Sequence, residues 1–161
     1  MSSECGVFIY EVRDHQDGQF HYYVSPLSHE HRGTSGLPPE AIMGELTGGP
    51  ERIAPEYFKH NVVFVEFLWW VIAKHAANCP DLVAAAKRQQ DGHVYILDGR
   101  TPTPEGDVPL EDIIGAVKIE NGRLLSFQGM PDHRLLTKDG LMQLDSWMHE
   151  RLVEELVALL E

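Results

Sequence analysis

The chain carries an apolar run that is too short to cross a membrane and therefore belongs inside the fold. The run covers residues 62–73 and is interrupted only by Glu66. A bilayer span needs roughly 20 consecutive apolar residues, and this run is flanked by lysine and histidine on both sides. We expect a buried central helix here, because twelve unpunctuated residues leading into an alanine-rich segment favour a helix over a strand.

Length and charge narrow the class of protein. With 161 residues, of which 43% are hydrophobic, the chain is expected to form one domain over residues 1–161 around a single core. It carries 25 acidic and 13 basic residues, for a formal charge of -12. This charge repels phosphate backbones and anionic lipid headgroups, so we expect neither nucleic-acid nor membrane binding. The acidic residues are spread along the chain, which indicates a solvated surface and would also steer a protein partner with a basic surface.

Cysteine content bears on the compartment. Cys5 and Cys79 are the only cysteines, too few for a disulfide framework or a paired-cysteine metal site. The first residues lack the basic region, apolar core and cleavage site of a secretory signal. The expected location is therefore the cytoplasm.

Alternating patterns and turn residues predict strands. In residues 7–13 and in residues 19–25 the side-chain pattern repeats every second residue, as along a strand. A connector containing Gly18 joins the two segments, which indicates a β-hairpin. Residues 113–120 and 123–127 flank Asn121-Gly122, the strongest short hairpin signal, because both positions tolerate positive φ. Residues 93–97 predict one further short strand.

Helices are expected in three places. The central helix is predicted from Glu56 to about Asn78, a second covers residues 80–90, and Asp145 is placed to cap a final amphipathic helix. Residues 26–55 are rich in proline and glycine and predict a long irregular connection, with at most one helical turn at residues 40–46.

The resulting order, ββ-αα-βββ-α with a short third strand, predicts an α+β fold. In such a fold a mainly antiparallel sheet packs on helices, here the central apolar helix and the C-terminal amphipathic helix.

Two polar loops suggest a ligand site. One loop follows the strand at 93–97 and the other follows the last hairpin, so polar groups at two strand ends can converge on a ligand. An Asp beside a His could then orient the imidazole as a general base. This predicts a small-molecule or enzyme site at loops 98–107 and 128–140. The alternative is that these groups cap turns and pair charges. The candidate residues are Asp98, Arg100, Asp132, His133 and Arg134.

No recognised catalytic or cofactor motif accompanies those loops. There is no nucleophile elbow, phosphate-binding glycine motif or zinc-protease motif. We therefore expect no cofactor, and the sequence favours a protein that is not an enzyme.

The predicted central helix has a polar stripe with a tryptophan in it. Successive residues placed 100° apart bring Lys59, Glu66, Trp70 and Lys74 to one side of the helix. A large aromatic among charges is typical of an interface anchor, although another segment of the same chain can also cover it. The opposite side is expected in the core, and its members are Phe58, Val62, Val65, Leu68, Trp69 and Ile72.

His29-Glu30-His31 is the densest group among nine histidines. If the segment is extended, His29 and His31 point the same way, because side chains alternate along a strand. With His21 or His15 as third ligand, they would form a site suited to zinc, nickel or copper. A solvent-exposed pair is the alternative.

The leading functional hypothesis is a small, soluble, acidic domain that binds another protein as an adaptor, accessory or inhibitor. It depends on the acidic surface, the long loops and the absence of a catalytic motif. The alternatives are the ligand or enzyme site at the two polar loops and the metal site at His29 and His31.

Overall fold

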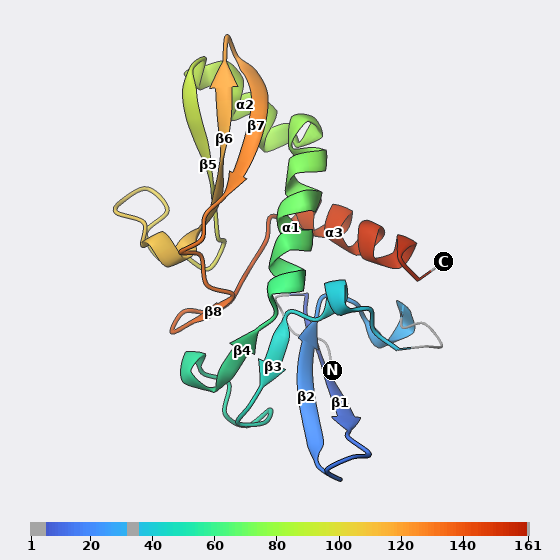
Figure 1. Ribbon diagram of the computed structural model, residues 1–161. Helices are drawn as coiled ribbons and strands as arrows, with labels where there is room; N and C mark the ends of the chain where they lie inside the picture. The colour runs from blue at the N-terminus through green and yellow to red at the C-terminus, as the bar shows by residue number, and fades with distance from the viewer. Residues whose placement is uncertain (1–5, 32–35, 161) are drawn as a thin grey trace. The chain divides into compact units, whose positions relative to one another are not determined.

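The computed structural model describes residues 6–31 and 36–160, and it divides the chain into two compact units. Unit 1 comprises Met1–Phe67, Leu135–Leu141 and Val153–Glu161, and unit 2 comprises Leu68–Arg134 and Met142–Leu152. Cys5 lies outside the described residues. The helices and strands, drawn in Figure 1, are β1 (Phe8–Arg13), β2 (Phe20–Ser25), β3 (Gly44–Leu46), β4 (Phe58–His60), α1 (Val62–His75), α2 (Pro80–Gln89), β5 (Gly92–Leu97), β6 (Ile113–Glu120), β7 (Arg123–Gly129), β8 (Leu136–Thr137), β9 (Gly140–Leu141) and α3 (Ser146–Ala158).

Unit 1 contains an antiparallel sheet in the order β1-β2-β3-β4. The predicted hairpin of β1 and β2 is confirmed, with Tyr10 opposite Tyr23. Strand β3 lies inside the connection for which an irregular course was expected. Its pairing with β4 depends on Gly44, because a Cβ there would lie 2.4 Å from the ring of Phe58. A second, two-stranded sheet in unit 1 pairs β8 with β9.

The central helix begins later than the sequence predicts. Pro55 opens a single 3₁₀ turn, Pro55–Tyr57, after which the chain is extended as β4. Asn61 then caps α1, because its side-chain oxygen accepts a hydrogen bond from the Val63 amide at 3.2 Å. The side-chain nitrogen of Asn61 also donates to the carbonyls of Pro39 and Ile42, each at 2.9 Å, which connects the start of α1 to the long connection.

The buried side of α1 differs from the expected one. Val62 was expected in the core but is 56% exposed, because it is the first residue of the helix. Trp69 lies on the expected apolar side and packs in unit 2 against Gly129. The fully buried side chains of α1 are Phe64, Leu68, Val71 and Ile72.

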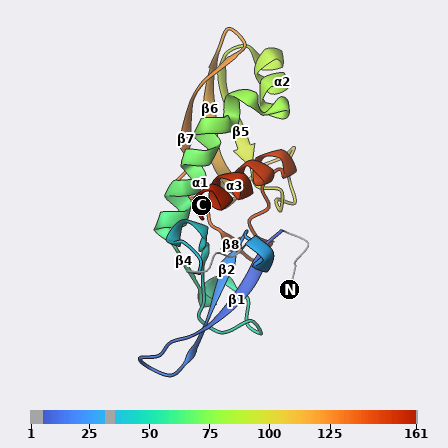
Figure 2. The ribbon, with the colours of Figure 1, turned by 90° about the vertical axis from the view of Figure 1, so that its right-hand side faces the viewer.

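Unit 2 contains an antiparallel sheet in the order β5-β6-β7, and α2 covers one face of it (Figures 1 and 2). The turn prediction is confirmed: Asn121 and Gly122 have φ of 53° and 75°, and Glu120 lies opposite Arg123. The middle strand β6 supplies the centre of the core, since Ile114 and Val117 are at most 1% exposed.

Aromatic rings lie directly on glycine backbone in unit 2. Gly115 and Gly129 are paired residues of β6 and β7. A Cβ on Gly115 would be 2.4 Å from the Phe127 ring, and one on Gly129 would be 2.2 Å from the Trp69 indole. Because real Cβ contacts are never this short, the packing of both rings requires glycine at these positions.

Helix α3 starts as the sequence predicts. The Asp145 carboxylate accepts a hydrogen bond from the Met148 amide at 3.2 Å, which caps the helix. Met148, Leu152 and Leu156 are buried. The α+β class with antiparallel pairing is therefore confirmed, although the strands that were expected in one sheet belong to separate sheets.

Among the described residues, no individual helix combines the length and apolar character needed to cross a bilayer. The segments Val62–Asn78 and Pro80–Gln89 meet both criteria only when taken together, and a 65° bend separates them.

The thiol of Cys79 is enclosed and is expected to react slowly. Cys79 sits at the N-cap of α2 with 4% of its surface exposed, and burial raises the pKa of its thiol. Since the thiolate is the reactive form, a Cys5→Ser protein should react with a disulfide reagent such as Ellman's reagent about 100-fold more slowly when native than when unfolded in urea. Complete reaction of the native protein within the mixing time would contradict this placement.

Candidate functional site

Three of the five residues predicted at the ligand site meet in the interior of unit 2. The imidazole of His133 lies 3.0 Å from an Asp98 carboxylate oxygen, and the guanidinium of Arg100 is 3.6 Å from the same oxygen. The side chains of Asp98 and Arg100 are fully buried, and that of His133 is 4% exposed. The two predicted loops therefore do converge, but they converge on buried side chains.

Sequence reasoning missed the fourth member of this cluster, Asp112. The Nε of Arg100 donates to an Asp112 carboxylate oxygen at 2.9 Å, and neither side chain is exposed. The same guanidinium donates to the backbone carbonyls of Glu111 and Arg134. No spacing in the sequence marks Asp112, because it lies beyond the predicted loop 98–107, in the 3₁₀ turn Leu110–Asp112 before β6.

The cluster joins three segments of unit 2 by backbone contacts as well. The other Asp98 oxygen accepts hydrogen bonds from the amides of Gln143 at 2.8 Å and Arg100 at 3.2 Å. The Asp98 amide donates to the Asp112 carbonyl at 2.7 Å. A general base must reach its substrate, and the imidazole of His133 is enclosed. The geometry is that of an internal ion-pair network holding loops together.

The other two predicted ligand residues face solvent. Asp132 and Arg134 are exposed, and the guanidinium of Arg134 donates long hydrogen bonds of 3.3 and 3.5 Å to the carbonyls of Pro131 and His133. The structure thus separates the set into a buried trio and an exposed pair. Ligand binding by these five residues stays a prediction.

The surface of α1 in unit 2 exposes a tryptophan. Trp70 is 50% exposed, and the ammonium group of Lys74 lies 4.9 Å from the centroid of its ring. Ala73 and Ala77 are exposed on the same side, one and two turns further on. We call these four residues the Trp70 surface. The ammonium group of Lys74 covers part of the ring.

The other two residues of the predicted stripe belong to unit 1. Glu66 is exposed on α1, one turn before Trp70. Lys59 is exposed on β4, so its predicted position on the helix is wrong, because the helix starts only after Asn61.

The segment with His29 and His31 is not extended as expected. It forms the 3₁₀ turn His29–His31, in which alternate residues no longer point the same way. His29 packs against Tyr10, with ring centroids 4.2 Å apart. The side chain of His31 lies outside the described residues. A metal site at His29 and His31 stays a prediction, but the extended backbone on which it was based is not present.

A different histidine of unit 1 lies among carboxylates. The imidazole of His21 bonds through Nδ1 to Glu45 at 2.9 Å, and its Nε2 lies 3.3 Å from Asp17 and 3.8 Å from Asp14. The hydrogen bonds to Glu45 and Asp17 raise the pKa of His21. The sequence suggested His21 only as a third metal ligand for His29 and His31. Its carboxylate neighbours lie up to 24 residues away in the sequence, so no local pattern reveals that they surround it.

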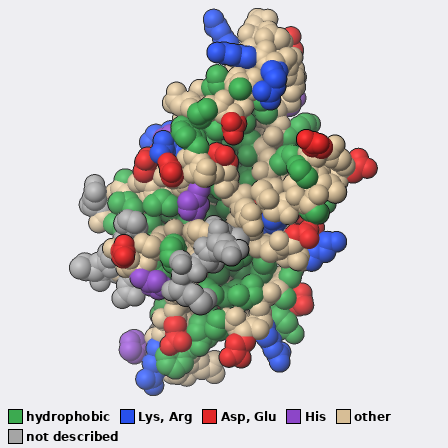
Figure 3. Space-filling model, turned by 180° about the vertical axis from the view of Figure 1, so that it is seen from behind, with side chains coloured by type: hydrophobic (Ala, Val, Ile, Leu, Met, Phe, Trp, Pro, Cys, Tyr) green, Lys and Arg blue, Asp and Glu red, His purple; other side chains and the backbone are tan. Residues whose placement is uncertain are grey.

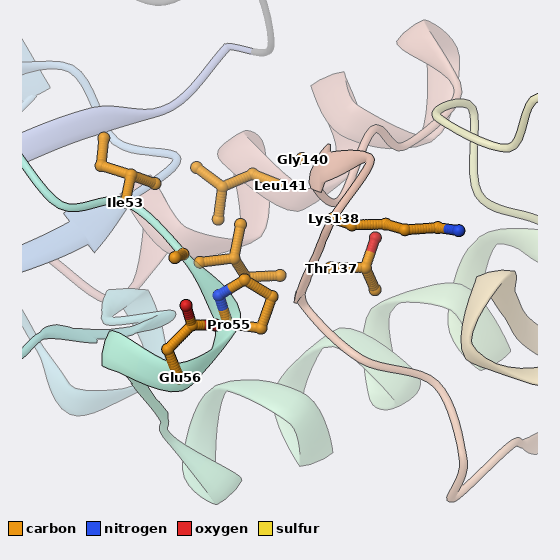
Figure 4. A pocket seen from close by; sticks show the side chains of 9 residues that line it. Ile53, Pro55, Glu56, Thr137, Lys138, Gly140 and Leu141 are labelled. Atoms are coloured by element: carbon orange, nitrogen blue, oxygen red, sulfur yellow. The ribbon is translucent and has the colours of Figure 1, made fainter.

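Unit 1 also has a pocket of about 460 Å³, a size within the range of small-molecule sites. It lies between residues 53–56 and the β8–β9 hairpin. Figure 4 shows Lys138 extending its amino group away from the apolar side chains of Ile53, Pro55 and Leu141. Besides Lys138, the polar side chains in its lining are those of Glu56 and Thr137.

Acidic side chains are scattered over the surface in the view of Figure 3, with basic side chains between them. This agrees with the spread of acidic residues along the sequence.

The comparisons with known proteins give no relative. No protein-family model matches the chain, and neither a curated protein nor a solved structure matches it.

Proposed function

We propose that this protein acts by binding another protein, and that the Trp70 surface of unit 2 is the anchor of that contact. The observation that carries the proposal is the half-exposed indole of Trp70 next to two exposed alanines and Lys74. Tryptophan is the residue type most enriched among those that dominate binding energy at protein interfaces.

The free energy available from covering this side chain is large for one residue. A tryptophan exposes roughly 200 Å² in full, so covering the exposed half removes about 100 Å² of mostly apolar surface from water, worth about 2.5 kcal/mol. Removing it from an interface is therefore expected to cost about 30-fold or more in affinity.

Charge supports a partner with a basic surface. The formal charge of -12 creates a field that attracts such a partner and raises the association rate, an effect that salt screens. The contact made by Trp70 is apolar and acts mainly on the dissociation rate, because interface substitutions mostly change that rate. Salt and the Trp70 substitution should therefore weaken binding independently.

A capture experiment with a matched control tests the proposal. The wild-type chain should retain the same partner from a native lysate at low and moderate salt, and Trp70→Ala should lose most of it at both. Tyr95→Ala is the control, because Tyr95 is another exposed aromatic of unit 2, 56% exposed on β5, outside the Trp70 surface. Equal capture by Trp70→Ala and wild type, or loss with Tyr95→Ala alone, would reject Trp70 as the anchor.

A further inference from the structure

The turn between β1 and β2 in unit 1 is visible in Figure 1. In and beside it, three side chains of types that can bind metal ions lie close together. Asp14 and Asp17 lie in the turn, and His21 lies on β2. One carboxylate oxygen from each Asp and the Nε2 of His21 all lie within 4.8 Å of one another.

The two distances from His21 suit ligand atoms around one small divalent ion. The Nε2 of His21 is 3.3 Å from Asp17 Oδ2 and 3.8 Å from Asp14 Oδ2. Two ligand atoms on a tetrahedral Zn²⁺ with bonds near 2 Å lie about 3.3 Å apart. The pair of His21 and Asp17 already has this separation, and the Asp14 oxygen, 3.8 Å from Nε2, needs a small side-chain rotation to join them around one ion.

Charge at this turn points to a cation. With Glu45 included, three carboxylates surround one imidazole, so a proton on His21 leaves an excess of negative charge. When Nδ1 donates its hydrogen to Glu45, the Nε2 of a neutral ring directs its lone pair toward two carboxylate oxygens. A divalent cation at that point takes the place of the proton that Nε2 otherwise shares with Asp17, and the imidazole and the two carboxylates become its ligands.

Each ligand also has the outer partner that metal sites use. Glu45 accepts a hydrogen bond from Nδ1 of His21 at 2.9 Å, which fixes the ring orientation. The second oxygens of the two aspartates accept hydrogen bonds from backbone amides, Gln16 to Asp14 at 2.8 Å and Gln19 to Asp17 at 2.7 Å. The other oxygen of each aspartate faces His21, and that of Asp17 pairs with Nε2 at 3.3 Å, a pairing that a bound ion would replace.

We propose that Asp14, Asp17 and His21 bind one divalent transition-metal ion, with Glu45 as the outer residue that orients His21. One imidazole and two carboxylates suit Zn²⁺ or Mn²⁺, and three protein ligands leave the remaining positions to water. This site is separate from the protein-binding role proposed for the Trp70 surface.

The test is a calorimetric titration of the untagged full chain with Zn²⁺ and, separately, with Mn²⁺. One equivalent of at least one of these ions should bind in the micromolar range. Asp17→Asn should weaken binding at least tenfold, because it removes a charged ligand while its amide oxygen still accepts the Gln19 hydrogen bond. His29→Gln/His31→Gln is the control and should bind as wild type. Circular dichroism confirms that each variant is folded.

The proposal is overturned by any of three results. Absence of binding of both ions to the wild-type chain below millimolar concentration rejects the site. Unchanged binding by folded Asp17→Asn rejects Asp17 as a ligand. Loss of binding in His29→Gln/His31→Gln, with Asp17→Asn unaffected, moves the site to the other histidines.

Discussion

Replacing Arg100 with methionine is expected to lower the free energy of unfolding by about 3–5 kcal/mol. Methionine keeps much of the apolar stem but removes the guanidinium that pairs with Asp112 at 2.9 Å and lies 3.6 Å from Asp98. Both carboxylates are fully buried, so the change leaves negative charge inside unit 2. At the same time the carbonyls of Glu111 and Arg134 lose the guanidinium as a donor, and the Glu111 carbonyl keeps only the bond from the Arg134 amide among those described. Urea unfolding followed by circular dichroism measures the effect.

The neighbouring loop offers a matched control. Arg134 has the same side chain but is exposed, so Arg134→Met should change the free energy of unfolding by no more than about 0.5 kcal/mol. Adding Asp112→Asn to Arg100→Met should recover part of the loss, because it removes one of the two buried charges. Equal, small effects of the two arginine substitutions would show that the ion-pair network does not stabilise the fold.

Gly129→Ala is expected to cost about 1–3 kcal/mol, the usual range for overpacking a filled core. The added Cβ would lie 2.2 Å from the Trp69 indole, which is too short for any real contact. Either the indole or β7 must move, and the adjacent Gly115 is itself covered by the Phe127 ring. Urea unfolding measures the loss, and a changed tryptophan emission spectrum of the native protein would report movement of the indole.

Gly106 provides the comparison for this change. The nearest atom to a Cβ at Gly106 is Thr103 Cβ at 3.7 Å, an ordinary contact. Gly106→Ala should therefore be neutral or slightly stabilising, by at most about 1 kcal/mol, because alanine restricts the unfolded chain. The ring-on-glycine packing would be wrong if Gly129→Ala were as well tolerated as Gly106→Ala.

The elements that sequence predicts well are those with local signals. The Asn121-Gly122 turn, the β1–β2 hairpin and the Asp145 cap each depend on residues close together in the chain, and all three are present. Strands β3 and β4 were missed, because three residues are too few to show a period and their pairing is decided by distant partners. The late start of α1 was missed because Pro55 suits the first turn of a helix, whereas the chain forms only one 3₁₀ turn there and then pairs residues 58–60 with β3 before Asn61 caps α1.

The candidate sites show the same division. The pattern predicts that Asp98, Arg100 and His133 approach each other, and they do. Their side chains were expected to face a ligand, but they are buried inside unit 2. Periodicity predicts Trp70 on a polar side of α1, and its exposure agrees with that placement. The grouping of His21 with Asp14, Asp17 and Glu45 needs the pairing of β2 with its neighbours, which no local pattern contains.

The affinity of a purified partner for the Trp70→Ala chain tests the proposed function most directly. The partner is the protein retained by the wild-type chain, and its dissociation constant is measured by calorimetry for wild type, Trp70→Ala and Tyr95→Ala. The account predicts that Trp70→Ala weakens binding by about 30-fold or more while Tyr95→Ala stays within a few-fold of wild type. A Trp70→Ala chain that is folded and binds within twofold of wild type would contradict it.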